Sequence, residues 1–199
     1  MCWNAEVSLQ TFLFGFVSFF IAYFFHFPFQ KLVFFLSFTS IQLLEYFLWT
    51  FLKNSKYNKL FSIIGYILIT LIPFVSLYLI TDIPLRNKLM ILYVLYFSFY
   101  TIYKYPKLDF KTTIGENHHL LYNFIPQDGV FYYSIWMIFF FLGVILSKDI
   151  VIILFAFVTI IFSVYYQNKD RTFSSYWCYS ANFLWIYVYI FILLKKMKN

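Results

Sequence analysis

The sequence is poor in charged residues. Asp, Glu, Lys and Arg make up 12% of the 199 residues, against about a quarter in an ordinary soluble domain. So few charged side chains cannot cover the surface of a globule of this size. This shortage argues against a soluble enzyme, a nucleic-acid-binding module and a disordered chain.

Cysteine and several sequence motifs are also scarce or missing. Two cysteines are too few for a disulfide scaffold. No Walker, G-x-G-x-x-G, G-x-S-x-G or H-E-x-x-H motif occurs, so the sites that those motifs build are excluded. No lysine lies in the middle of the last apolar segment, which excludes a retinal Schiff base.

Apolar and aromatic residues are abundant instead. They make up 63% of the chain, with 30 Phe and 19 Tyr, and the net charge of +7 comes from basic residues that lie between apolar runs. Lys and Arg in those positions are typical of membrane-flanking residues. The composition predicts a multi-pass integral membrane protein with the lipid bilayer as its partner, and no nucleic acid.

Seven apolar segments approach the length of about 20 residues that a helix needs to cross a bilayer. We therefore expect an all-α bundle of about seven transmembrane helices, with residues 1–199 forming one transmembrane domain. The fourth and fifth segments are the shortest, which leaves five or six helices as alternatives. The expected spans are Leu9–Phe27, Leu32–Leu52, Leu60–Ile80, Leu89–Tyr103, Val130–Leu146, Ile150–Gln167 and Tyr176–Leu194.

The orientation in the membrane is not determined by charge. With seven spans, eight Lys and Arg residues fall on the face of the N-terminus, which we call side A, and seven on the opposite face, side B. The positive-inside rule needs a clearer asymmetry than this. Which membrane holds the protein and whether it forms a homo-oligomer are left open as well.

Among Asp, Glu, Lys and Arg, one residue, Glu45, lies inside a predicted span. Such residues usually face a cavity or a partner, because a charge in the bilayer centre costs at least ~2.5–3.5 kcal/mol. Gln42, Glu45 and Trp49 are spaced to share one face of a helix. From the direction of the second span, Glu45 lies roughly 10 Å below the surface of side A.

The predicted topology brings further polar and aromatic residues to side A. They come from the N-terminal segment, from the longest loop and from the start of the last span. The candidate binding residues are Asn4, Glu6, His118, His119, Tyr122, Trp177 and Asn182, together with Gln42 and Trp49, and the candidate reactive side chains are Glu45, Cys2 and Cys178.

Three functions are compatible with this convergence. The first is binding or transport of a small cation, a proton or a solute at Glu45. The second is an intramembrane enzyme acting on a lipid or a small apolar substrate, with Glu45 as general acid or base and Cys2 or Cys178 as nucleophile. The third is a structural or interaction protein whose polar cluster only fixes helix packing.

No cofactor is required by any of these functions. A bound zinc or other transition metal is an alternative, with Cys2, Cys178, His118 and His119 as candidate ligands. These residue types can bind zinc, but their spacing follows no known zinc motif. The competing interpretations are inert or palmitoylated cysteines, a disulfide between Cys2 and Cys178 in an oxidising compartment, and ordinary loop histidines.

Three short motifs resemble a polytopic membrane protein family to which no activity is assigned. They are Met1-Cys2-x-Asn4-Ala5-Glu6-x-Ser8, Gln42-x-x-Glu45-x-x-x-Trp49 and the late Trp177-Cys178. Bacterial members of that family begin MCFSA-x-ASF and carry QQ-x-x-EG-x-x-W and a late WC, and relatives occur in large DNA viruses. Asn4 stands where the bacterial pattern has Ser, and Tyr46 where it has Gly. The resemblance implies a polytopic membrane fold and highlights the side-A residues, but supplies no function.

Overall fold

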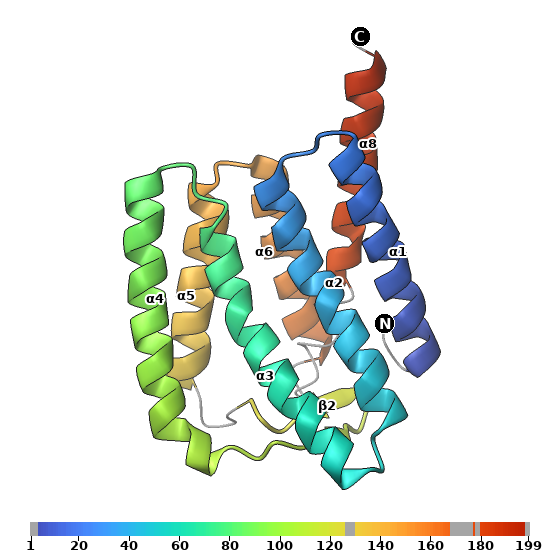
Figure 1. Cartoon of the computed structure of the whole chain (residues 1–199), viewed down its shortest axis with the longest axis vertical. Helices are drawn as coiled ribbons and strands as arrows, with labels where there is room; N and C mark the ends of the chain where they lie inside the picture. The colour runs from blue at the N-terminus through green and yellow to red at the C-terminus, as the bar shows by residue number, and fades with distance from the viewer. Residues whose placement is uncertain (1–3, 126–129, 168–176, 178–179, 198–199) are drawn as a thin grey trace.

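The computed structural model describes residues 4–125, 130–167, 177 and 180–197, which form a helical bundle with one short β-hairpin at its end (Figure 1). The all-α prediction is confirmed. The helices are α1 (Ala5–Phe24), α2 (Phe29–Thr50), α3 (Ser55–Leu77), α4 (Ile83–Lys104), α5 (Val130–Leu146), α6 (Ile150–Gln167) and α8 (Leu184–Met197). The remaining elements are the 3₁₀ turns η1 (Tyr105–Lys107) and η2 (Ala181–Phe183) and the antiparallel strands β1 (Thr112–Ile114) and β2 (Leu120–Tyr122).

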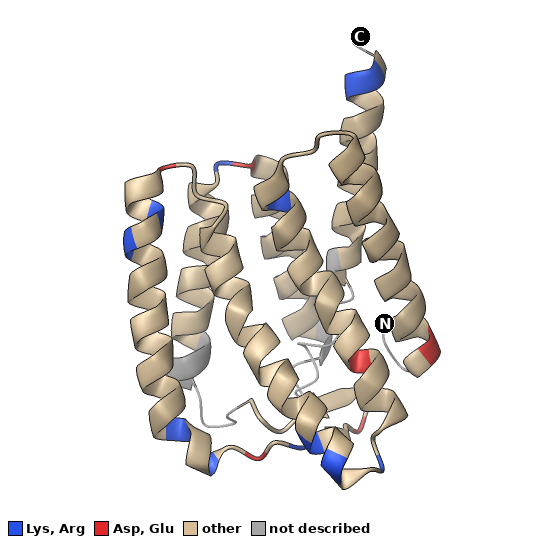
Figure 2. Ribbon diagram, viewed as in Figure 1, with Lys and Arg blue, Asp and Glu red and all other residues tan. Residues whose placement is uncertain are grey.

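The helices run alternately up and down through the bundle (Figure 1). α2 packs between α1 and α3, α3 also packs against α5, and α4 lies at one edge against α3. The start of α1, the α2–α3 turn and the hairpin lie at the lower end, side A. The α1–α2, α3–α4 and α5–α6 turns lie at the upper end, side B. Lys and Arg gather toward these two ends (Figure 2).

Three helices, α1, α2 and α3, are long and apolar enough to cross a membrane. Two shorter apolar segments, Ser134–Leu146 and Ile150–Tyr165, lie within α5 and α6. α4 has 22 residues, but Arg86 and Lys88 interrupt the apolar character of its first turns. The prediction of helices suited to a membrane is therefore confirmed for three of the seven expected spans.

Side-chain caps determine where three helices begin. The side-chain oxygens of Asn4, Asn54 and Asp82 each accept a hydrogen bond from the backbone N–H three residues later, at 2.8, 3.2 and 3.0 Å. Such caps satisfy N–H groups that have no partner within the helix. Asp82 therefore starts α4 at Ile83, earlier than the predicted start at Leu89.

The last predicted span is interrupted in the structure. A single helix is predicted from residue 176; Trp177 and Ser180 are helical, and the tighter turn η2 separates them from α8, which begins at Leu184. The Ser180 hydroxyl donates to the backbone carbonyl of Trp177 at 2.8 Å. Side chains of this kind compete with the helical hydrogen bonds of the backbone, which explains an interruption where the apolar pattern alone suggested continuity.

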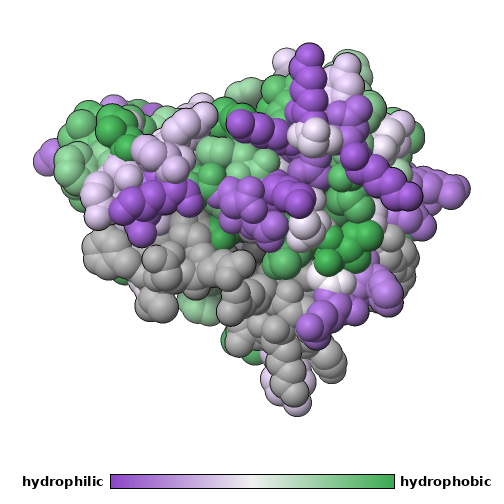
Figure 3. All heavy atoms as spheres, turned by 90° about the horizontal axis from the view of Figure 1, so that it is seen from below, coloured by the Kyte–Doolittle hydropathy of each residue, from purple (hydrophilic) through white to green (hydrophobic). Residues whose placement is uncertain are grey.

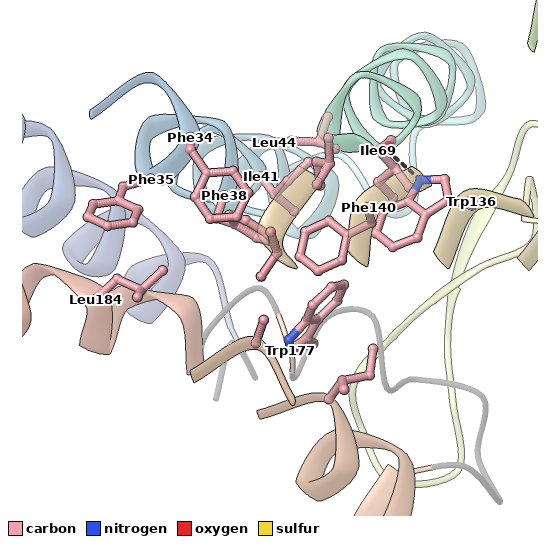
Figure 4. Close-up of a cluster of buried hydrophobic side chains, with 14 of the residues drawn as sticks. Phe34, Phe35, Phe38, Ile41, Leu44, Ile69, Trp136, Phe140, Trp177 and Leu184 are labelled. Carbon is pink, nitrogen blue, oxygen red and sulfur yellow. Dashed lines mark hydrogen bonds between the residues drawn. The ribbon is translucent and has the colours of Figure 1, made fainter. Parts of the chain in front are cut away.

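α3 continues through Pro73, which cannot donate a hydrogen bond to the carbonyl of Ile69. The indole Nε1 of Trp136 in α5 donates to that carbonyl instead, at 2.9 Å (Figure 4). The Tyr93 hydroxyl in α4 donates to the next carbonyl, that of Thr70, at 2.6 Å. An unpaired backbone carbonyl in apolar surroundings costs several kcal/mol. The bonds from Trp136 and Tyr93 avoid this cost, and they also attach α5 and α4 to α3 near Pro73.

Aromatic rings fill the centre of the bundle (Figure 4). The Trp177 ring lies 5.1 Å from that of Phe140 and 5.6 Å from that of Phe38, both edge to face, which is a favourable geometry for aromatic pairs. α5 approaches α3 closely at Gly143, where a Cβ atom would lie 2.3 Å from the carbonyl carbon of Ser76. The centre is thus closely packed, and the polar groups of interest lie toward side A.

Candidate functional site

The site is built on Glu45 of α2, five residues before the helix ends on side A. Its side chain and that of Gln42, one turn earlier, have no exposed surface. Both face the interior of the bundle, because a spacing of three residues places them on one side of the helix. Trp49, one turn later, is half-buried and packs against the same core.

Side chains from two other elements reach this face of α2. The Tyr122 hydroxyl, from strand β2, donates a hydrogen bond to Oε1 of Glu45. The Thr11 hydroxyl, from α1, lies 3.1 Å from Oε1 of Gln42, to which it donates. Glu45 is therefore joined to the hairpin, and Gln42, one turn earlier, to α1.

The two histidines, His118 and His119, have different surroundings in the structure. His118 is exposed and has a φ angle of 61°, in the left-handed region, at the hairpin turn. His119 is buried, with 4% of its surface exposed, and its backbone N–H is bonded to the side chain of Asn117 at 3.1 Å. Of these two histidines, only His119 has its side chain buried.

Asn4 and Glu6 serve the start of α1. Asn4 caps the helix, as described above, and Glu6 is an exposed residue of the first turn whose carboxylate accepts from the Gln10 amide at 3.3 Å. An acidic side chain at this position favours the helix through its dipole. The structure gives both residues a local role in α1.

The aromatic side chain expected from the last span, Trp177, is buried in the aromatic centre. Its Nε1 donates to the Thr159 hydroxyl of α6 at 2.9 Å. Asn182 lies in η2 and is partly buried. Trp177 therefore contributes to the packing of α6 against α2 and α5.

Cys2 and Cys178, the two candidate thiols, lie outside the described residues. Within the described part of the chain, no group of three or more His, Cys, Asp or Glu side chains is placed to hold a metal ion. The site oxygens described above are the carboxyl of Glu45 and the hydroxyl of Tyr122 that donates to it.

Seen from side A, hydrophilic side chains spread across the end of the bundle below this site (Figure 3). The exposed lysines described at this end are Lys53, Lys56, Lys59, Lys107 and Lys111. The buried carboxyl is thus separated from a polar, basic surface by the hairpin and the ends of α2 and α3.

A second polar cluster lies on side B and was not expected from the sequence. Lys31 of α2 forms an ion pair with Asp149 at the start of α6, and the Tyr187 hydroxyl of α8 lies 3.4 Å from the same carboxylate. Burial opposes ionisation of Asp149, but hydrogen bonds from Lys31 and from the N–H groups of Ile152 and Val151 outweigh it and lower the pKa of Asp149. The cluster joins three helices.

Sequence reasoning missed Thr11, Asn58, Ser62 and Thr112, which bond to the site or to the hairpin. Two of them carry a signal: Asn58 and Ser62 are polar residues four apart near the start of an apolar helix, so they share a buried face. Thr112 and Thr11 stand among other polar residues and carry no such signal.

No protein family, curated protein or solved structure matches the chain.

Proposed function

We propose that the protein is an integral membrane protein of seven spans that binds and transports a proton or a small cation at Glu45. The observation that carries the proposal is the complete burial of this carboxyl in an apolar helix, with Tyr122 donating to it. Such residues within membrane helices commonly mark ion and proton pathways.

The alternating course of the helices supports seven spans. α1, α2 and α3 have the required length and apolar character. If α4, α5, α6 and the last segment cross as well, the start of α1, the α2–α3 turn and the hairpin all face side A, as they do in Figure 1. The charged residues then lie toward the two membrane surfaces.

The surroundings of Glu45 suit reversible binding of a charge. The carboxyl oxygens are permissible ligands for a cation and a site for a proton, and the Gln42 amide oxygen lies on the same face. The residues that carry the family resemblance on α2, namely Gln42, Glu45 and Trp49, lie around this position. The resemblance supports the site without indicating what it binds.

A packing role is the second candidate, because the hydrogen bond from Tyr122 also ties the hairpin to α2. The two functions differ in what they require of the carboxyl. Transport requires a group that gains and loses charge, whereas packing requires only a hydrogen-bond acceptor of the same shape. A glutamine fulfils the second requirement but not the first.

The test is Glu45→Gln in purified protein reconstituted into liposomes. Proton uptake is followed with a pH-sensitive dye under imposed H⁺, Na⁺ and K⁺ gradients, and thermal unfolding is measured in detergent. We expect the flux to fall at least tenfold, about 1.4 kcal/mol in transition-state terms, with an unchanged melting temperature. The matched control is Glu6→Gln, at an exposed position of α1.

A flux that Glu45→Gln leaves unchanged overturns the transport proposal. If no flux is found, the packing role is supported when Glu45→Gln is tolerated and Glu45→Ala lowers the melting temperature, since alanine removes the acceptor.

A further inference from the structure

We infer that the hairpin β1–β2 is a gate over Glu45 on side A, and that Asn58 of α3 is the positioning residue on which the gate turns. This inference rests on the proposed function, because it assigns the element that controls access to the same carboxyl. It is based on the different ways in which the hairpin is joined to α3 and to α2.

On the α3 side the hairpin is held by hydrogen bonds between neutral groups. Asn58, which is 2% exposed, donates from Nδ2 to the carbonyl of Thr112 at 3.0 Å and accepts from the N–H of Thr112 at 2.9 Å. The side-chain amide thus pairs with strand β1 as a neighbouring strand would. The hydroxyls of Ser62 and Thr112 are also bonded, at 2.9 Å.

The same face of α3 also receives the chain where it leaves the hairpin. Gly65 follows Ser62 by three residues, and a Cβ atom at Gly65 would lie 3.0 Å from the ring of Phe124 and 2.9 Å from Leu44. Phe124, two residues after β2, is fully buried. Because glycine leaves room for this ring, α3 holds the hairpin at its entry and at its exit.

On the α2 side the hairpin reaches the functional group itself. Thr112 lies directly opposite Tyr122 in the two-stranded sheet, and opposite residues project from the same face of a sheet. The residue anchored to α3 is therefore the cross-strand neighbour of the residue that donates to Glu45. A rotation about the pairing of Asn58 with Thr112 moves Tyr122 away from Glu45 and leaves the α3 anchor in place.

Binding of a cation or proton to Glu45 requires the contact between the hairpin and α2 to change, and not the contacts between the hairpin and α3. A cation or proton that binds Oε1 of Glu45 competes with the Tyr122 hydroxyl for that oxygen. The bonds of Asn58 and Ser62 to Thr112 use no atom of the site. Access from side A therefore requires the contact with α2 to open, while the contacts with α3 serve as the hinge.

The test measures the accessibility of Glu45 and not its activity. Full-length wild type, Asn58→Leu and Ser62→Ala are treated with a water-soluble carbodiimide and an amine, and modification of Glu45 is measured by peptide mass spectrometry. Hydrogen exchange over residues 112–122 reports the freedom of the hairpin. The matched control is Asn87→Leu, at an exposed position of α4.

We expect Asn58→Leu to accelerate both the modification of Glu45 and the exchange of the hairpin about tenfold, because it removes both hydrogen bonds to Thr112 and each contributes about threefold. Ser62→Ala removes only one hydroxyl, so about threefold is expected for it. Asn87→Leu leaves both rates unchanged.

Two results overturn the inference. Faster exchange of the hairpin with unchanged modification of Glu45 shows that the hairpin does not cover the carboxyl. Unchanged exchange in Asn58→Leu shows that Asn58 is not the anchor. If Asn58→Leu does not fold, the same criteria are applied to Ser62→Ala. Both readouts are independent of flux, so a failure of the gate is distinguished from a failure of the proposed transport function.

Discussion

At the scale of single residues, two carboxyls with little exposed surface in the described part of the chain, Glu45 and Asp149, have different surroundings. Glu45 is fully buried on α2 and accepts a hydrogen bond from a tyrosine. Asp149 lies at the turn before α6, where Lys31 and two backbone N–H groups satisfy its charge. The charge of Asp149 is therefore stabilised by its partners while it joins three helices, whereas Glu45 is the carboxyl to which the proposed function assigns binding of a proton or cation.

The ion pair of Asp149 should make the folded protein less stable in acid. Its pKa is lowered in the folded protein, so its contribution to stability is complete above the unfolded value of about 3.9 and is lost as the pH falls through the lower, folded value. Melting temperatures measured in detergent from about pH 6 to pH 3 should fall less steeply in Asp149→Asn than in wild type. At neutral pH Asp149→Asn should be the less stable protein.

The exposed residue Asp109 provides the control for this measurement. Asp109→Asn should keep the acid slope of the wild type. Equal slopes in wild type and Asp149→Asn would show that the ion pair with Lys31 does not contribute to the stability of the folded chain.

At the scale of elements, α3 packs against α2, α4, α5 and the hairpin. One face carries the hairpin at Asn58 and Ser62, and then Phe124 at Gly65. Further along, the carbonyls near Pro73 accept hydrogen bonds from α4 and α5. Because Pro73 has no N–H, the carbonyl of Ile69 lacks the partner it would have in a regular helix. The indole N–H of Trp136 in α5 donates to it instead.

A double-mutant cycle tests this use of the proline. Trp136→Phe removes the donor to the Ile69 carbonyl and should lower the free energy of unfolding by about 1–3 kcal/mol, the cost of an unsatisfied buried group. In a Pro73→Ala background the alanine N–H can donate to that carbonyl, so Trp136→Phe should cost less. Equal costs in the two backgrounds, from denaturant unfolding in detergent, would contradict this account.

At the scale of the whole molecule, the alternating helices predict the side on which each turn lies. In a chain carrying Cys2→Ser and Cys178→Ser, single cysteines are introduced by Lys53→Cys in the α2–α3 turn, Glu116→Cys at the hairpin turn and Thr81→Cys in the α3–α4 turn. All three positions are exposed. A membrane-impermeant maleimide should label the first two from one face of oriented vesicles and the third only from the other.

Complete labelling after detergent treatment is the control for reactivity. Labelling of Lys53→Cys and Thr81→Cys from the same face would show that α3 does not cross the membrane. Labelling of Glu116→Cys from the same face as Thr81→Cys would show that α4, the helix between these two positions, does not cross the membrane.

The amino-acid sequence alone predicts a helical bundle suited to a membrane and a face of the second helix that carries both Gln42 and Glu45, which the structure buries. Both follow from local properties, because apolar segment length and helical spacing depend on residues close together in the chain. It did not determine the start of α4, which depends on the cap at Asp82, or the turn η2 before α8, next to which the Ser180 hydroxyl bonds to the carbonyl of Trp177.

The groups that cover and hold the Glu45 carboxyl come from segments far away in the chain. Tyr122 is 77 residues from Glu45 along the chain, and Thr112 is 54 residues from Asn58. Such contacts depend on how the loop folds back between α2 and α3, for which helical periodicity contains no information. The ion pair of Lys31 with Asp149, 118 residues apart, arises in the same way. Local pattern thus predicts the helices and their buried faces, while the partners of each buried polar group are decided by packing.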